Sequence, residues 1–167
     1  MSAASYVDAG TFRHALGHFL TGVTVATTCG LDGEPVGMTA NAFMSVSLDP
    51  PLVMLSVART AASFEAMEQC DRYAVHILCD GQQELSKVFA RSAADGVEKF
   101  DGVDWHRAED GLPLLDGCLA RIECTVVDRV ELGDHVGYVG RVDAAHAKGE
   151  DAPLGFFRGG YKRLSEF

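Results

Sequence analysis

The sequence predicts a mainly β protein, an antiparallel barrel with a few short helices beside it. Six or seven segments are rich in β-branched and aromatic residues, as strands are, and most are joined by short turns that contain Gly or Asp. Long helices do not alternate with these segments, so a doubly wound parallel sheet is disfavoured. A closed antiparallel barrel flanked or plugged by helices accounts for the pattern better.

The first half of the chain is predicted to begin with a helix over residues 11–19, where apolar residues recur at helical spacing. A β-branched strand over 23–28 follows, and the Asp-Gly pair in 31–34 predicts a hairpin turn. The returning strand contains small residues and runs to the double proline at 50–51. An apolar strand over 52–58 comes next.

In the second half, apolar residues at helical spacing predict two more short helices, over residues 61–69 and 82–89. Further strands are predicted over 73–79, 118–130, 135–145 and 153–157. The two long strands are joined by a tight turn at Leu132-Gly133-Asp134. The stretch 96–113, which contains the only tryptophan, is predicted to be irregular and at the surface.

Length and charge restrict the possible functions. The 167 residues predict a single domain, residues 1–167, in which residues 1–9 form a flexible N-terminal segment. A net charge of −10 argues against a nucleic-acid partner. No apolar run approaches the roughly 20 residues of a membrane span, and no signal peptide is recognisable, so we expect a cytoplasmic protein.

The cysteines and histidines predict neither a disulfide framework nor a metal site. The five cysteines are odd in number and include no C-x-x-C pair. His14 and His18 have the spacing of a zinc-protease helix, but Ala15 stands where such a helix carries its glutamate. No P-loop, no G-x-G-x-x-G after a strand and no G-x-S-x-G are present.

The segment from Gly37 to Val53 is the most informative of the chain. It carries small and hydroxylated residues where an ordinary buried strand carries bulky ones. Small side chains allow a planar ligand to approach the backbone, and the Asn41 amide can both donate and accept hydrogen bonds. This pattern indicates a strand edge that binds a cofactor. A half-exposed strand with ordinary Thr and Ser pairs explains it equally well.

Two further constellations suggest a ligand with phosphate groups. Thr60 or Ser63 can cap the helix that follows, where free N–H groups bind phosphate, and Arg59 adds a forked cation. Arg91 ends another helix and can reach a phosphate. The alternatives are a plain helix cap with a solvated arginine, and an arginine that complements the helix dipole.

The turn Gly133-Asp134-His135 joins the two longest strands and places His135 at the rim of the barrel. A histidine there can pack on or bond an incoming substrate. The alternative is an ordinary turn with a surface histidine.

Taken in order, these segments resemble the flavin reductase family of two-component monooxygenases, whose fold is an FMN-binding split barrel. The similarity extends from about Phe12 to Leu164. The motifs that carry it are Phe12-Arg13, Thr21-Gly22-Val23-Thr24-Val25, Gly37-Met38-Thr39-Ala40-Asn41-Ala42-Phe43, Ser45-Val46-Ser47-Leu48-Asp49-Pro50-Pro51-Leu52, Phe89-Ala90, Gly133-Asp134-His135, Pro153-Leu154 and Arg158-Gly159-Gly160-Tyr161.

The resemblance implies a Greek-key split β-barrel with a flavin site. The flavin ring would lie on the strand over residues 38–45, which includes Met38, Thr39, Ala40, Asn41, Ala42 and Ser45, and Thr24 would contact the ring or the ribityl chain. The phosphate would lie near Ser56, Ala58, Arg59 and Thr60, with Phe89 and Arg91 closing the pocket. Asp134, His135 and Tyr161 would lie on the side of the nicotinamide nucleotide, where His135 positions the nicotinamide.

The implied activity is an NAD(P)H:flavin oxidoreductase that uses FAD or FMN and NADH or NADPH. A homodimer is implied, with reduced flavin passing to a separate flavin-dependent monooxygenase. Because the two cofactors carry out this chemistry themselves, the lack of a catalytic triad is expected. Two alternatives are a non-enzymatic flavin-binding electron carrier or sensor of the same fold, and a split-barrel oxidase that acts on a small phosphorylated amine. The Gly-Asp-His turn and the double proline argue against the oxidase.

Overall fold

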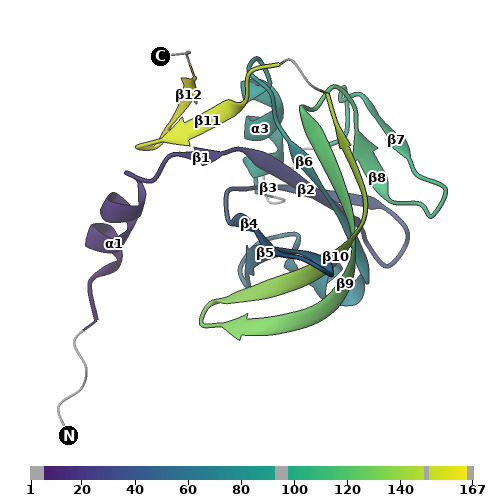
Figure 1. The fold of residues 1–167 in the computed structure, drawn as a ribbon, viewed down its shortest axis with the longest axis horizontal. Helices are drawn as coiled ribbons and strands as arrows, with labels where there is room; N and C mark the ends of the chain where they lie inside the picture. The colour runs from purple at the N-terminus through teal and green to yellow at the C-terminus, as the bar shows by residue number, and fades with distance from the viewer. Residues whose placement is uncertain (1–5, 93–97, 149–150, 165–167) are drawn as a thin grey trace, which may run out of the picture.

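A computed structural model describes residues 6–92, 98–148 and 151–164, which form three α-helices and twelve β-strands (Figure 1). In chain order they are α1 (Ala9–Leu16), β1 (Thr21–Gly22), β2 (Thr24–Cys29), β3 (Pro35–Ala40), β4 (Phe43–Leu48), β5 (Pro51–Ala58), α2 (Phe64–Gln69), β6 (Arg72–Ile77), α3 (Gln83–Ala90), β7 (Trp105–Arg107), β8 (Pro113–Leu115), β9 (Ala120–Leu132), β10 (His135–Ala147), β11 (Leu154–Phe157) and β12 (Gly160–Arg163). The mainly β class is confirmed.

The main sheet has seven antiparallel strands in the order β3-β2-β6-β9-β10-β5-β4. In the described part of the chain, its two edge strands, β3 and β4, are not hydrogen-bonded to each other. Closure of the barrel, which the strand pattern led us to expect, is therefore not found among the described residues. The small-residue segment, predicted as one strand, is divided between these two edges by a corner at Asn41 and Ala42.

Two smaller sheets accompany the main one. Strands β1, β11 and β12 form one, and β7 and β8 form a hairpin. This hairpin corrects the prediction that residues 96–113 are irregular, and its Trp105 is half-buried rather than at the surface. The prediction failed because strands of three residues are too short to show a period of two.

The ends of several elements differ from the predictions. Helix α1 begins at Ala9 because the Asp8 carboxylate accepts hydrogen bonds from the N–H groups of Gly10 (2.9 Å) and Thr11 (3.0 Å). Asp8 and Ala9 therefore belong to this helical turn, whereas residues 1–5 of the predicted flexible segment lie outside the described residues. Helix α2 begins at Phe64, three residues later than predicted.

The core consists mainly of two clusters of buried apolar side chains. One cluster, centred on Tyr73, Tyr138 and Leu55, lies inside the curved main sheet, and the other joins β2 to α3 through Val25 and Phe89. All five cysteines are free thiols. The packing is close enough that a Cβ at Gly140 would lie 2.3 Å from the Tyr73 hydroxyl.

Candidate functional site

A groove of about 520 Å³ opens where edge strand β3 ends beside the end of β5. Its volume lies in the range in which proteins bind cofactors and other small molecules. Most of the residues that the sequence predicts for cofactor binding line it: Met38, Thr39, Ala40, Asn41, Ala42, Ser56, Ala58, Thr60, Phe89, Arg91 and His135. The fold thus brings predicted residues from distant segments to a single groove.

The corner between β3 and β4 shapes the groove wall. Here the Phe43 N–H donates to the Asn41 carbonyl (2.9 Å), and the Ser56 N–H donates to the Ala42 carbonyl (2.9 Å). The Asn41 amide donates to the Thr21 hydroxyl (3.0 Å). Because Ala42 is small and Asn41 is turned toward β1, the wall at this corner is formed largely by backbone.

Thr24 and Ser45 do not line the groove. Thr24 is buried behind the wall, where its hydroxyl donates to the Ala40 carbonyl (2.6 Å) and so fixes the end of β3. Ser45 lies exposed on the other edge strand, β4, opposite Val53 of β5. Thr24 therefore contacts a groove-lining residue, Ala40, through this hydrogen bond.

Helix α3 closes one side of the groove and packs directly on β3. The Phe89 ring is 1% exposed, and a Cβ at Gly37 would come within 2.5 Å of it, so this close approach requires glycine. The Thr39 hydroxyl also donates to the Ser86 carbonyl of α3 (2.6 Å). The glycine at position 37 therefore determines how near the helix lies to the strand.

Tyr161 lies behind α3 and outside the groove. Its hydroxyl donates to the Ser86 hydroxyl (2.9 Å), and its ring lies 5.5 Å from that of Phe156. In this structure it supports α3 through Ser86.

Arg59 is held away from the groove. Its guanidinium pairs with Glu131 at the end of β9 and lies 5.5 Å from the centre of the Phe64 ring. Its backbone N–H donates to the Asp134 carbonyl (3.0 Å). Arg59 therefore attaches the loop after β5 to the β9–β10 turn, and does not line the groove as the sequence predicted.

The predicted helix cap is confirmed only in its position, since Ser63 occupies the N-cap of α2. Ser63 makes no side-chain hydrogen bond to the helix terminus, and its hydroxyl donates instead to the Met38 sulfur (2.8 Å). Helix α2 has only six residues. Thr60 and Ser63 both line the groove, and phosphate binding at this helix terminus stays a prediction.

The groove also contains Lys99, a residue that nothing in the sequence marks. Its ammonium group donates to the carbonyls of Gly37 (3.2 Å) and Phe89 (3.1 Å), and burial lowers the pKa of Lys99. Together with Arg91 it supplies positive charge at the end of the groove beside α3. Five further lining residues were not predicted as cofactor ligands: Ala61, Ala62, Ser63, Ala90 and Ser92.

His135 lines the groove from the first position of β10. Its Nδ1 lies 2.7 Å from the Asp134 carboxylate, and the hydrogen bond and charge of His135 lower the pKa of Asp134. Asp134 itself does not line the groove. Because Asp134 engages Nδ1, Nε2 is the ring nitrogen through which His135 can contact a ligand.

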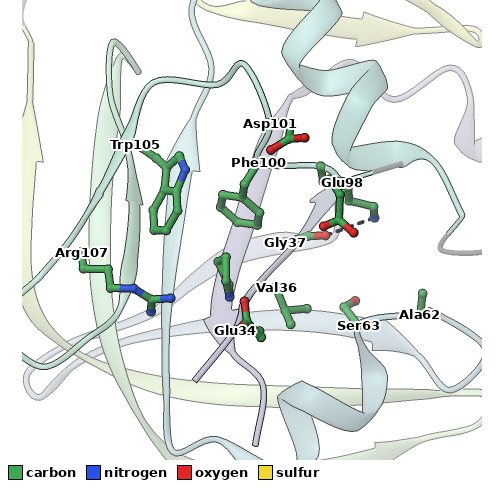
Figure 2. Close-up of a pocket in the computed structure, with 12 residues that line it drawn as sticks. Glu34, Val36, Gly37, Ala62, Ser63, Glu98, Phe100, Asp101, Trp105 and Arg107 are labelled. Carbon is green, nitrogen blue, oxygen red and sulfur yellow. Dashed lines mark hydrogen bonds between the residues drawn. The ribbon is translucent and has the colours of Figure 1, made fainter. Parts of the chain in front are cut away.

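Two other hollows adjoin this groove. One, of about 740 Å³, lies beyond Lys99 and is bordered by Trp105, Phe100 and Arg107 (Figure 2). The other, of about 530 Å³, is mainly apolar and lies between α1 and strands β4 and β5. Among the described residues, no cluster of three or more His, Cys, Asp or Glu side chains could hold a metal ion, and no helix is long and apolar enough to cross a membrane. The groove offers small side chains, hydroxyls, one imidazole and two cations, a set suited to positioning a bound nucleotide.

Comparison with known proteins gives consistent matches to one family. Residues 16–165 match the model of the flavin reductase like domain. The chain is 44% identical over 158 residues to the stachydrine N-demethylase reductase subunit Stc3 of Rhizobium meliloti, covering 95% of this chain and 67% of that protein. It is 42% identical over 149 residues to the reductase component of the flavin-dependent trigonelline monooxygenase of Acinetobacter baylyi, covering 89% of this chain and 47% of that protein. This chain therefore spans about half to two thirds of the length of these relatives.

Among solved structures, the NADH:FAD oxidoreductase SgcE6 of Streptomyces globisporus C-1027 superimposes with a TM-score of 0.88 at 37% identity. The match covers 99% of this chain and 100% of that one.

Proposed function

The chain belongs to the flavin reductase like domain family, and we propose that it is an NAD(P)H-dependent flavin reductase that supplies reduced flavin to a separate monooxygenase. The observation that carries the proposal is the groove between β3 and β5, which gathers the corner at Asn41, the rim residue His135 and the cations Arg91 and Lys99. Relatives that are named as reductase components of oxygenases support the separate partner.

The residues of the groove fit a flavin. The corner at Asn41 and Ala42 presents backbone where a bulky side chain would block a planar ring. On the opposite wall, the side chains of Ser56 and Ala58 are also small. Lys99 and Arg91 offer two cations for a phosphate. A groove of about 520 Å³ is large enough for a mononucleotide.

The two nucleotides supply the chemistry, a hydride passing from the nicotinamide to the flavin. The corner and the small side chains of the groove walls orient the ring. In this proposal, the hydroxyl groups nearest to the bound flavin are those of Thr39, Thr60 and Ser63. His135 contacts the nicotinamide nucleotide through Nε2 while Asp134 fixes its orientation through Nδ1. The protein thus holds the two rings in position and excludes water. Such positioning can lower the activation barrier of a reaction between two bound rings by a large amount.

A steady-state assay that crosses FMN and FAD with NADH and NADPH tests the activity. We expect oxidation of the nucleotide only when free flavin is added, because no other acceptor is part of the proposal. Tight stoichiometric flavin with no nucleotide oxidation would favour the electron carrier instead. Absence of turnover with all four pairs would remove the enzyme proposal.

The role of His135 can be tested separately. His135→Ala is expected to raise the KM for the nicotinamide nucleotide about tenfold, the effect of losing roughly 1.4 kcal/mol of binding, with a much smaller change in the KM for flavin. His146→Ala is the matched control, since His146 lies exposed on the same strand and does not line the groove. An unchanged nucleotide KM would refute the assignment.

We also propose that the protein is a homodimer in which a second copy covers α1. This helix has no buried residue and projects from the rest of the chain (Figure 1). Phe12, Leu16 and Phe19 are 53–73% exposed on or just after it, and Met44 of β4 is 53% exposed beside the apolar hollow. Such a patch exceeds the scattered apolar exposure of an ordinary monomer surface.

Sedimentation measurements test the dimer. The wild-type protein is expected to sediment as a dimer, and Leu16→Asp as a monomer, because a buried unpaired charge at an interface is strongly unfavourable. Leu31→Asp is the control, since Leu31 is 77% exposed in the β2–β3 turn. A monomeric wild-type protein, or a dimeric Leu16→Asp variant, would contradict the proposal.

The compartment is a proposal as well. We place the enzyme in the cytoplasm, a reducing compartment in which five unpaired cysteines remain thiols.

A further inference from the structure

Two histidines at the end of α1 have no role in the proposed reaction. His14 lies in the last turn of the helix and His18 follows it by four residues, so the two side chains lie on the same side of the helix. Their ring centres are 4.9 Å apart, and the ring planes are inclined at 71°. Both residues are exposed. The fold thus brings two accessible imidazoles together.

A hydrogen bond determines the tautomer of His18. Its Nδ1 lies 2.8 Å from the His14 carbonyl oxygen. Because a carbonyl oxygen can only accept, Nδ1 carries the proton, and in the neutral ring Nε2 holds the free lone pair. Histidines that bind metal ions are oriented in the same way, by a hydrogen bond from the other ring nitrogen to a carbonyl or carboxylate. His18 therefore already has the form that a metal ligand requires.

The surroundings of the pair leave the His14 ring available as a second ligand. Among the described residues, none forms a hydrogen bond or an ion pair with the His14 side chain. The His18 ring lies 6.1 Å from that of Phe157, and the carbonyl of Gly17 accepts the N–H of Arg158 (2.9 Å). These contacts hold the turn after α1 in place while both rings stay exposed.

The electrostatic setting of the pair favours a cation. The two rings lie at the carboxyl end of α1, where the helix dipole is negative. The whole chain carries a net charge of −10. Arg13, the basic residue next to His14, lines the apolar hollow between α1 and strands β4 and β5, which neither histidine lines. Its charge is therefore directed to another side of the helix.

Imidazole ligands select the kind of cation. Zn²⁺ and Ni²⁺ are bound well by imidazole nitrogen, whereas Mg²⁺ prefers oxygen ligands. No third His, Cys, Asp or Glu side chain of the described residues completes a cluster here, so water would occupy the other coordination positions. A structural zinc site has four protein ligands. A site with two is expected to bind its cation reversibly.

We propose that His14 and His18 form a binding site for a divalent transition-metal cation, Zn²⁺ or Ni²⁺, in which His18 coordinates through Nε2. The proposal is independent of the flavin reductase activity, because neither residue lines the groove. A cation bound to both rings would connect the last turn of α1 to the residue that follows it. Phe12 and Leu16 each lie two residues before one of the histidines, on the opposite face of α1. The proposed dimer, which covers that apolar face, therefore leaves the site accessible.

Isothermal titration calorimetry with ZnCl₂ and with NiCl₂ tests the site, with the full chain purified without a histidine tag. We expect the pair to bind one cation per chain, and MgCl₂ to give no binding. His14→Ala and His18→Ala should each weaken the binding of Zn²⁺ and Ni²⁺ at least about tenfold, since even the loss of a group that only orients a metal ligand costs that much.

His146→Ala is the matched control. His146 is another exposed histidine, on β10, and lies 3.9 Å from the Glu123 carboxylate. Its removal is expected to leave the affinity unaltered. All the variants keep the five free thiols, so a cation bound by cysteines would bind to them as it does to the wild type. Because the replaced side chains are exposed, we expect the variants to fold, which far-UV circular dichroism verifies.

Nitrogen-15 NMR of the histidine rings identifies the coordinating nitrogen. Addition of ZnCl₂ should shift the resonance of His18 Nε2, while Nδ1 keeps its proton and its bond to the His14 carbonyl. Three results would overturn the proposal. They are a wild-type protein that binds neither cation, an unaltered affinity in either His14→Ala or His18→Ala, and a His18 ring that coordinates through Nδ1.

Discussion

Acidification is expected to destabilise this fold through one buried histidine, His76. Its ring is 0% exposed in the centre of the main sheet. Nδ1 lies 3.1 Å from the Val25 carbonyl, and Nε2 accepts the N–H of Leu115 (3.0 Å). The ring must therefore be neutral, with its proton on Nδ1. A second proton on Nε2 would oppose the N–H donor of Leu115.

The size of the effect follows from the pKa of His76, which burial lowers from 6.5 to about 4. Because the folded pKa lies below the unfolded one, the unfolded chain binds more protons between these values, and stability falls as the pH falls. Relative to pH 7.5, the loss in free energy of unfolding is about 2 kcal/mol at pH 5 and about 3 kcal/mol at pH 4.

Urea unfolding measured from pH 7.5 to pH 5 provides the assay. The range ends at pH 5 so that carboxyl groups do not titrate within it. Asp143 is an example: burial raises its pKa, but hydrogen bonds from Thr125 and Arg141 outweigh this effect and lower the pKa overall. His76→Gln is the comparison, because its amide can donate and accept but does not titrate in this range. Equal slopes for the two proteins would refute the reasoning. Should His76→Gln fail to fold, an NMR titration that finds the wild-type His76 ring protonated above pH 6 would refute it as well.

Two glycines provide further predictions. Gly140→Ala is expected to lower the free energy of unfolding by about 1–3 kcal/mol, because its Cβ would overlap the Tyr73 hydroxyl at 2.3 Å. Gly22→Ala, which meets nothing within 4 Å, is the control, and equal melting temperatures would contradict the packing argument. Gly37→Ala is expected to displace the Phe89 ring and raise the flavin Kd about fivefold, which corresponds to a loss of about 1 kcal/mol of binding free energy. An unaltered Kd in a folded variant would mean that α3 does not shape the groove.

Much of the fold was predictable because local pattern and tertiary structure agree. The Asp-Gly pair ending at Gly33 predicted the β2–β3 hairpin, and Gly33 has the positive φ of 77° that such a turn requires. The two longest strands and their turn were predicted from β-branched residues and Gly133, which has a φ of 68°. The open edges of the sheet could not be predicted, since they depend on how β3 and β4 diverge in space.

The site was predictable where its residues are consecutive and not where they depend on distant partners. The corner from Met38 to Ala42 stood out in the sequence through its small residues, and it lines the groove. Arg59 was assigned to phosphate because its partner Glu131, 72 residues away, could not be foreseen. Lys99 was missed for the opposite reason, since a single lysine in a segment without periodicity carries no local mark.

The attachment of Arg59 to the β9–β10 turn has a consequence for engineering. Arg59 precedes the groove residue Thr60 directly, and it is bound to both Glu131 and the Asp134 carbonyl, next to His135. In the proposed assignment, the loop that meets one nucleotide is thereby joined to the turn that meets the other. Selecting variants for a new reductant by rebuilding this turn should alter flavin preference in the same step, so the two specificities are expected to evolve together.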